Sequence, residues 1–336
     1  MLIELWFFLL GIFLIIYVVL DGFDLGGAFI SPIITKEESE RRIILNAIGK
    51  VWDANEVWLI SFGAFLFGMF PLAYAKFFSA AYIPVMLLVF ALIFRAVSFE
   101  FRSQVNSKTW KSIWDWILSI SSLLIIIILS AAGANILKGV DLSDENFRLN
   151  LIDALNPFAL ITALTTTSFI VYHSLLYLSN KTEGELLNKV KKFSNIFFYL
   201  SIVTLILWTI FSLFFEKQIF TNIIKYPLIV IVPTLSILSF IFSKLSYEKN
   251  KKLSFLLSSL NIGGVILTVG LLMYPALIRS SKDPIYDITI YKAASNELTL
   301  TIGFIVALVG IILVSIYQYF IYKTFSGTIK SEDIHY

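Results

Sequence analysis

The sequence predicts an all-α polytopic membrane protein with nine transmembrane helices. Hydrophobic residues make up 58% of the 336 residues before the 16 glycines are counted, and charged residues make up only 15%. Mean hydropathy is +0.85. So few polar side chains cannot cover a water-exposed surface, which excludes a disordered chain and an ordinary soluble enzyme. The net charge of +3 is too small to indicate nucleic-acid binding.

Nine apolar runs with few interior charges are long enough to cross a membrane. They cover residues 5–34, 53–75, 80–102, 113–137, 157–179, 193–215, 227–243, 253–278 and 298–322. The first exceeds one perpendicular crossing, which predicts a tilt or an extension beyond the membrane. The seventh is the weakest because it contains Pro227 and Pro233. The loops 138–156 and 279–297 are long enough to fold over a membrane face.

The distribution of Lys and Arg predicts the orientation of these helices. The loops after the first, third, fifth and seventh helices and the C-terminal tail, counted with Arg102 at the end of the third helix, carry 17 of them, and the loops on the other side carry 8. Because basic loops stay in the cytoplasm, this imbalance gives the multi-pass chain a direction across the membrane. Its N-terminus would lie outside and its C-terminus in the cytoplasm. The N-terminus lacks the basic region of a cleaved signal peptide, so the first helix is expected to be permanent.

Charged residues inside apolar runs are costly and therefore informative. Asp21 and Asp24 share one face of the first helix, beside glycines that permit close helix packing. The alternative is that both lie at the membrane interface and help to end the span, but apolar sequence continues to Ile34. Asp53 and Glu56, with Asn55 between them, open the second helix next to Trp52. An acidic first turn stabilised by the helix dipole is the alternative there.

Two further clusters follow at the same predicted side of the membrane. Arg95 lies two turns inside the third helix and needs a carboxylate partner, for which Asp21, Asp53 and Glu100 are candidates. Arg102 ends that helix, where an arginine can also simply reach the interface. Asp115 opens the fourth helix between two tryptophans, a pattern equally typical of an interfacial aromatic belt.

The topology brings these four clusters to the cytoplasmic side, as a hydrated proton path requires. A substrate or ion site is the competing interpretation, and it would make the chain a proton- or sodium-coupled secondary transporter. A purely structural scaffold would leave the aspartates without a purpose. Polar residues concentrate in the first half of the chain, whereas transporters often repeat them in both halves.

Redox metals are not expected to bind this chain directly. It contains no Cys and only two histidines, His173 and His335, so no thiolate-held metal and no evident pair of axial haem ligands exist. His173 lies among hydroxyl side chains, which favours a hydrogen-bonded packing role. No metal site is therefore expected.

The motifs Asp21-Gly22-Phe23-Asp24-Leu25-Gly26, Trp52-Asp53-Ala54-Asn55-Glu56-Val57-Trp58-Leu59, Phe94-Arg95 with Phe99-Glu100-Phe101-Arg102, and Trp114-Asp115-Trp116 resemble subunit II of cytochrome bd-type quinol oxidases. Their order and spacing match over residues 1–120. Ala96 departs from the Pro expected there, and Lys50 stands near a position that is often Pro. The resemblance implies two four-helix bundles, 1–137 and 157–278, and a peripheral helix with a cytoplasmic tail, 298–336.

The resemblance also implies a function. Such a complex lies in a bacterial or archaeal plasma membrane, where it oxidises quinol, reduces oxygen to water and takes protons from the cytoplasm. Haems b and d and the quinol-oxidising loop are expected in subunit I, the partner chain. Subunit II is expected to support assembly and to contribute Asp21 and Asp53 to the proton path, with Asp24 and Trp52 implicated in the haem-bearing assembly. The resemblance further allows a small single-helix third subunit, a structural quinone in this chain, and contacts with membrane lipid and the quinone pool.

Overall fold

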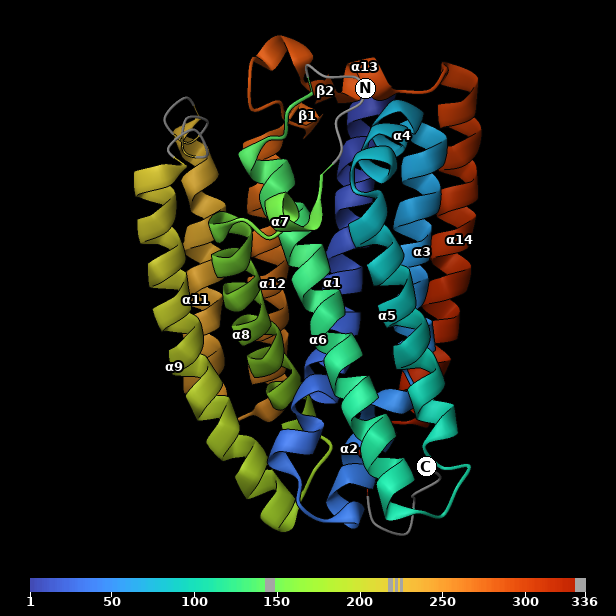
Figure 1. Ribbon diagram of the computed structural model, residues 1–336, viewed down its shortest axis with the longest axis vertical. Helices are drawn as coiled ribbons and strands as arrows, with labels where there is room; N and C mark the ends of the chain where they lie inside the picture. Colours follow the sequence, from blue (N-terminus) through green and yellow to red (C-terminus); the bar gives the residue numbers. More distant parts are fainter. Residues whose placement is uncertain (143–148, 217–219, 221–222, 224–225, 330–336) are drawn as a thin grey trace.

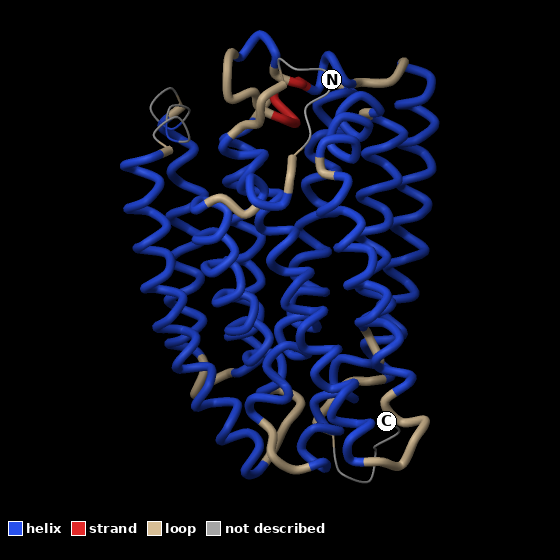
Figure 2. The backbone as a smooth tube through the Cα atoms, viewed as in Figure 1, coloured by secondary structure: helices blue, strands red, loops and turns tan. Residues whose placement is uncertain are grey.

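Long helices run side by side along the longest dimension of the molecule (Figures 1 and 2). This computed structural model describes residues 1–142, 149–216, 220, 223 and 226–329. His335 and the end of the predicted tail lie outside the described residues. Helices that are long and apolar enough to cross a membrane are α1 (Leu2–Ile34), α5 (Tyr82–Phe101), α6 (Lys108–Lys138), α8 (Pro157–Ser179), α9 (Gly184–Phe215), α11 (Ile231–Ser246, with the 3-10 turn Pro227–Val230 before it), α12 (Lys251–Met273) and α14 (Glu297–Thr324).

These helices confirm the predicted all-α polytopic class. The described part of the chain has eight candidate spans, and nine if the bent pair α3 (Trp52–Met69) and α4 (Pro71–Ala80) forms one span. The start of α1 and the end of α14 lie at opposite ends of the molecule, as an odd number of crossings requires (Figure 1).

The second predicted span, 53–75, is wrong as one continuous helix. The chain bends by 116° between α3 and α4. Phe70 has φ −132° and ψ 60°, outside the helical region, because the proline that follows disfavours a helical conformation at this position. Pro71 then starts α4, where its missing N–H would have had no partner in any case.

The loop predicted after the first span contains a further helix, α2 (Glu38–Gly49). Its buried face includes Ile44, Leu45 and Ile48, which pack in one core cluster with the end of α1. At 12 residues and with a charged first half, α2 is too short and too polar to register as a span. It lies at the end of the molecule opposite the N-terminus (Figure 1).

Helix α1 is the centre of the packing, because it contacts α3, α6, α8 and α12. The other main pairings join α5 to α6, α8 to α9 and α11 to α12, while α14 packs on α3 and α1. The α1–α8 contact is close enough to require glycine. A Cβ on Gly26 would lie 2.6 Å from the carbonyl oxygen of Ile170 and 2.8 Å from Cβ of Ser174.

Two side chains of α8 bond to main-chain carbonyls of α1 at this contact. Ser174 Oγ donates to the oxygen of Phe23 (2.6 Å), and His173 Nε2 bonds to the oxygen of Val19 (2.9 Å). Together with Gly26 they set how α1 is rotated against α8. The acidic side chains of α1 consequently point toward other helices.

The two long predicted loops lie together at the end that holds the N-terminus (Figure 1). Strands β1 (Ala276–Ile278) and β2 (Ile288–Thr289) form an antiparallel pair, followed by α13 (Ile290–Ala293). The loop 138–156, which contains α7 (Leu151–Ala154), meets them through a bridge between Val140 and Ser280. Residues 143–148 of that loop lie outside the described part.

Candidate functional site

Asp21 and Arg95 form a fully buried ion pair between α1 and α5. Nη1 of Arg95 donates to Oδ2 of Asp21 at 2.9 Å, and Nη2 donates to Oδ1 in a second, short bond. Of the three carboxylates considered from the sequence, Asp21 is therefore the partner. Two charges withdrawn from water persist only when they are paired and hydrogen-bonded, and the parallel two-bond geometry meets that condition.

The tryptophan of the second motif flanks this ion pair. The guanidinium of Arg95 lies 5.8 Å from the ring centre of Trp52, within the range of a cation–π contact. Trp52 in turn stacks on Phe99, with 5.7 Å between ring centres and 12° between planes. Arg95 Nε, although buried, has no hydrogen-bond partner among the described residues.

Asp24, the second acid of α1, is also fully buried, and it faces α3 instead of α5. Nδ2 of Asn55 donates to Oδ2 of Asp24 at 2.7 Å. Oδ1 of Asn55 accepts from the hydroxyl of Tyr322 at 2.8 Å. The other oxygen of Asp24, Oδ1, accepts no hydrogen bond within the described structure. Asp24 is thus a buried acid in which Oδ2 accepts a hydrogen bond and Oδ1 accepts none among the described residues.

The acids of α3 extend from this buried centre to the surface of the chain. Glu56 is half-buried, and Asp53 is exposed. Glu56 lies within electrostatic range of Asp21 and Arg95 on one side and of Asp53 on the other. The four acids therefore lie at increasing depth, from exposed Asp53 through Glu56 to buried Asp21 and Asp24.

Arg102 and Asp115 form a separate ionic cluster, nearer to the end of the molecule that holds α2. Nε of Arg102 donates to Oδ1 of Asp115 at 2.7 Å, and both side chains are buried. Two residues of the α2 region, absent from the predicted site, complete the cluster. Glu38 accepts two bonds from Arg102, at 2.7 and 3.1 Å, and Arg41 donates to Asp115 at 2.8 Å. Glu100, by contrast, is exposed and joins neither cluster.

The ionic cluster predicts a pH-dependent stability. Partial burial opposes ionisation of Glu38, but its hydrogen bond to Arg102 and the charges of Arg102 and Lys111 outweigh burial and lower its pKa below the ordinary 4.5. A lowered carboxyl pKa adds stability above the unfolded-state value, and this stability is lost as the pH falls through the folded-state value. Glu38 is nearly half exposed, so solvent screening limits the gain to under about 1 kcal/mol.

We therefore expect Glu38→Gln to lower the melting temperature of the purified protein slightly at pH 7. The difference from the parent should shrink as the pH approaches 4. Glu248→Gln, which removes a largely exposed acid on the α11–α12 connection, is the matched control. A Glu38→Gln effect of equal size at both pH values would contradict this assignment of the charge.

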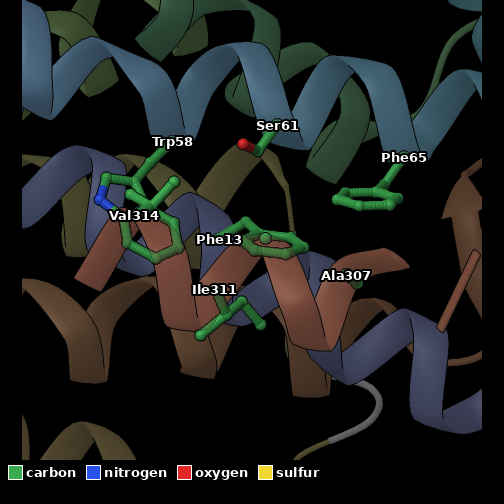
Figure 3. A pocket seen from close by; sticks show the side chains of 8 residues that line it. Phe13, Trp58, Ser61, Phe65, Ala307, Ile311 and Val314 are labelled. Carbon is green, nitrogen blue, oxygen red and sulfur yellow. The ribbon is translucent and has the colours of Figure 1, made fainter. Parts of the chain in front are cut away.

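A small cavity lies between α1, α3 and α14, where Phe13 and Phe65 stack face to face (Figure 3). Its volume is about 50 Å³. The lining is apolar apart from Ser61 and Trp58 (Figure 3). Small-molecule sites usually enclose roughly 300 Å³ or more, so this space matches a few water molecules and is too small for a quinone ring.

His173, the one histidine in the described part of the chain, is buried and uses both ring nitrogens. Nε2 bonds to the carbonyl of Val19, and Nδ1 lies 2.7 Å from Oγ of Ser258. His173 consequently does not fit the role of an axial haem ligand. Among the described residues, no group of three or more His, Cys, Asp or Glu side chains is arranged to hold a metal ion.

Comparison with known proteins gives a consistent family. Residues 2–325 match the family model described as cytochrome bd terminal oxidase subunit II. The chain is 30% identical to cytochrome bd-I ubiquinol oxidase subunit 2 of Escherichia coli K12, covering 98% of this chain and 95% of that protein. It is 29% identical to cytochrome bd ubiquinol oxidase subunit 2 of Bacillus subtilis 168, covering 95% of each.

A solved structure supports the fold. A chain of the bd oxidase from Geobacillus thermodenitrificans superposes with a TM-score of 0.79 at 17% identity, over 96% of this chain and 98% of that one. The family match extends well past residue 120, where the recognisable motifs end. The chain therefore belongs to the family of subunit II of the cytochrome bd terminal oxidases.

Proposed function

We propose that this chain works in a quinol-oxidising, oxygen-reducing membrane complex as the subunit that supports a haem-bearing partner and carries part of its cytoplasmic proton path. Family membership supports the complex, and its curated relatives are named as ubiquinol oxidase subunits. The partner, subunit I, would hold haems b and d, since His173 is committed to other bonds. The bound haems supply the oxygen chemistry, and the residues of this chain handle protons.

The observation that carries the proposal is the graded burial of four acids. Reduction of oxygen to water consumes one proton for every electron, so a buried oxygen site needs a supply of protons. Exposed Asp53 can take a proton from water, and Glu56 lies between it and the buried centre. Carboxyl groups at such positions can hold and release protons as their surroundings change.

The two buried acids have different parts in this proposal. Asp21 lines the path without exchanging the proton, because both of its carboxylate oxygens accept hydrogen bonds from Arg95. Asp24 exchanges the proton, because its Oδ1 atom accepts no hydrogen bond within the described structure and is free to bind a proton. Trp52 covers the guanidinium of Arg95 and keeps the ion pair in place. The alternative of a proton- or sodium-coupled transporter finds no support in the family match.

The path is tested by Asp53→Asn, which keeps the shape of the side chain and removes its proton-carrying group. We expect oxygen consumption with quinol to fall by about tenfold or more while the complex assembles with a normal haem spectrum. Glu248→Gln, an exposed acid outside the cluster, should keep the parent rate. Full turnover in Asp53→Asn would refute the proposed role of this acid.

A further inference from the structure

Helix α14 reaches the acid cluster from the far end of the chain. The hydroxyl of Tyr322 donates to Oδ1 of Asn55 at 2.8 Å, although 267 positions separate the two residues. One turn earlier, Nε2 of Gln318 donates to the carbonyl of Ala54 at 3.0 Å. Both bonds end on the first turn of α3, between Asp53 and Glu56. Helix α14 thus holds in place the start of α3, which carries Asp53 and Glu56.

The bond from Tyr322 also decides which way the amide of Asn55 points. Nδ2 donates to Oδ2 of Asp24 at 2.7 Å and makes a longer contact, 3.5 Å, to the carbonyl of Leu20. With the amide reversed, Oδ1 would face the carboxylate of Asp24, and two acceptors would repel each other. By donating to Oδ1 of Asn55, the hydroxyl of Tyr322 stabilises the orientation in which Nδ2 faces Asp24.

We propose that Tyr322 is a positioning residue for Asp24, acting through the amide of Asn55. This inference rests on the proposed function, in which Asp24 exchanges protons. The groups that face Asp24 are Asp21 on its own helix, Glu56 and Asn55 on α3, Arg95 on α5, Tyr177 on α8 and Tyr322 on α14. Of these neighbours, Asn55 donates a hydrogen bond to Asp24, so fixing its amide fixes how well the charged form of Asp24 is stabilised.

The test is Tyr322→Phe in the complete oxidase complex, which removes one hydroxyl and keeps the ring. The weakened bond to Asp24 should move the midpoint of the pH profile of oxygen reduction toward higher pH, by about half a unit to one unit. Tyr319→Phe and Tyr317→Phe are matched controls, because both tyrosines are exposed on the same helix. Both controls should keep the parent midpoint.

A double-mutant cycle separates positioning from mere packing. In an Asn55→Ala background, Tyr322→Phe should cause no further shift of the midpoint, because the amide that links Tyr322 to Asp24 is already absent. A shift that persists in that background would overturn the proposal. So would a Tyr322→Phe complex that loses haem or stability while its midpoint stays unchanged, since that result describes a structural contact only.

The outcomes also distinguish this inference from the proposed function. If Asp53→Asn slows turnover and Tyr322→Phe leaves the midpoint unmoved, the proton path stands and the positioning role falls. If Asp53→Asn retains full turnover and Tyr322→Phe moves the midpoint, the Asp53 route falls, and Tyr322 still acts on a group that titrates in turnover.

Discussion

Arg95→Ala is expected to abolish a stable, haem-containing complex. The substitution leaves the carboxylate of Asp21 fully buried without its counter-charge and without two hydrogen bonds. Removing one member of a buried ion pair typically costs about 3–5 kcal/mol, a large fraction of the stability of most domains. The measurement is haem content per purified complex, read from the reduced-minus-oxidised absorption spectrum, together with the melting temperature.

A second variant shows whether the lost charge balance is the cause. Asp21→Asn combined with Arg95→Met removes both charges, and replacing a whole buried pair by neutral side chains is often nearly neutral for stability. The double variant should therefore assemble far better than Arg95→Ala while its turnover remains impaired. A normal haem spectrum and melting temperature in Arg95→Ala would show that Asp21 does not depend on this arginine.

Gly26→Ala is expected to have the second-largest effect. Its added methyl group would lie 2.6 Å from a main-chain oxygen of Ile170, and a backbone atom cannot move aside as a flexible side chain can. The helices α1 and α8 must separate, which strains the bonds from Ser174 and His173 to α1. Overpacking of this kind typically costs about 1–3 kcal/mol, and the separated helices should also lose activity.

Gly11→Ala is the matched control for this substitution. Gly11 lies on the same helix, and nothing lies within 4 Å of the Cβ it would gain. Alanine favours a helix over glycine by about 1 kcal/mol, so this variant should match or exceed the parent in melting temperature. Equal melting temperatures and haem contents for Gly26→Ala and Gly11→Ala would mean that the close α1–α8 contact is not needed.

The sequence predicted the helices well where the signal is local. Nearly every long apolar run became a helix, because hydropathy over about 20 residues is a property of the segment itself. It failed at Phe70-Pro71, where one proline divides an apolar run without changing its mean hydropathy. It also missed α2, because a short amphipathic helix beside a membrane resembles a charged loop when only its lysines and arginines are counted.

Partners within the site were harder to predict than its members. Because a charge inside an apolar span is costly, the sequence identified Asp21 and Arg95 as members of the site. The choice of Asp21 over Asp53 or Glu100 as the partner of Arg95 depends on how α1, α3 and α5 are rotated. Glu38 and Arg41 join the second cluster because α2 places them beside Arg102 at the end of α5 and Asp115 near the start of α6, which no local pattern encodes. Tyr322 bonds Asn55 across 267 positions, and its sequence neighbours give no sign of that contact.

Proton uptake by the Asp53→Asn complex is the most direct test of the central claim. The complex is reconstituted in vesicles, and proton uptake from the side that bears α2 is followed with a pH-sensitive dye during a single turnover with oxygen. Slow uptake, in step with slowed oxygen reduction, is the predicted result, with Glu248→Gln taking up protons at the parent rate. Uptake at the parent rate in Asp53→Asn would contradict a proton path through the acids of this chain.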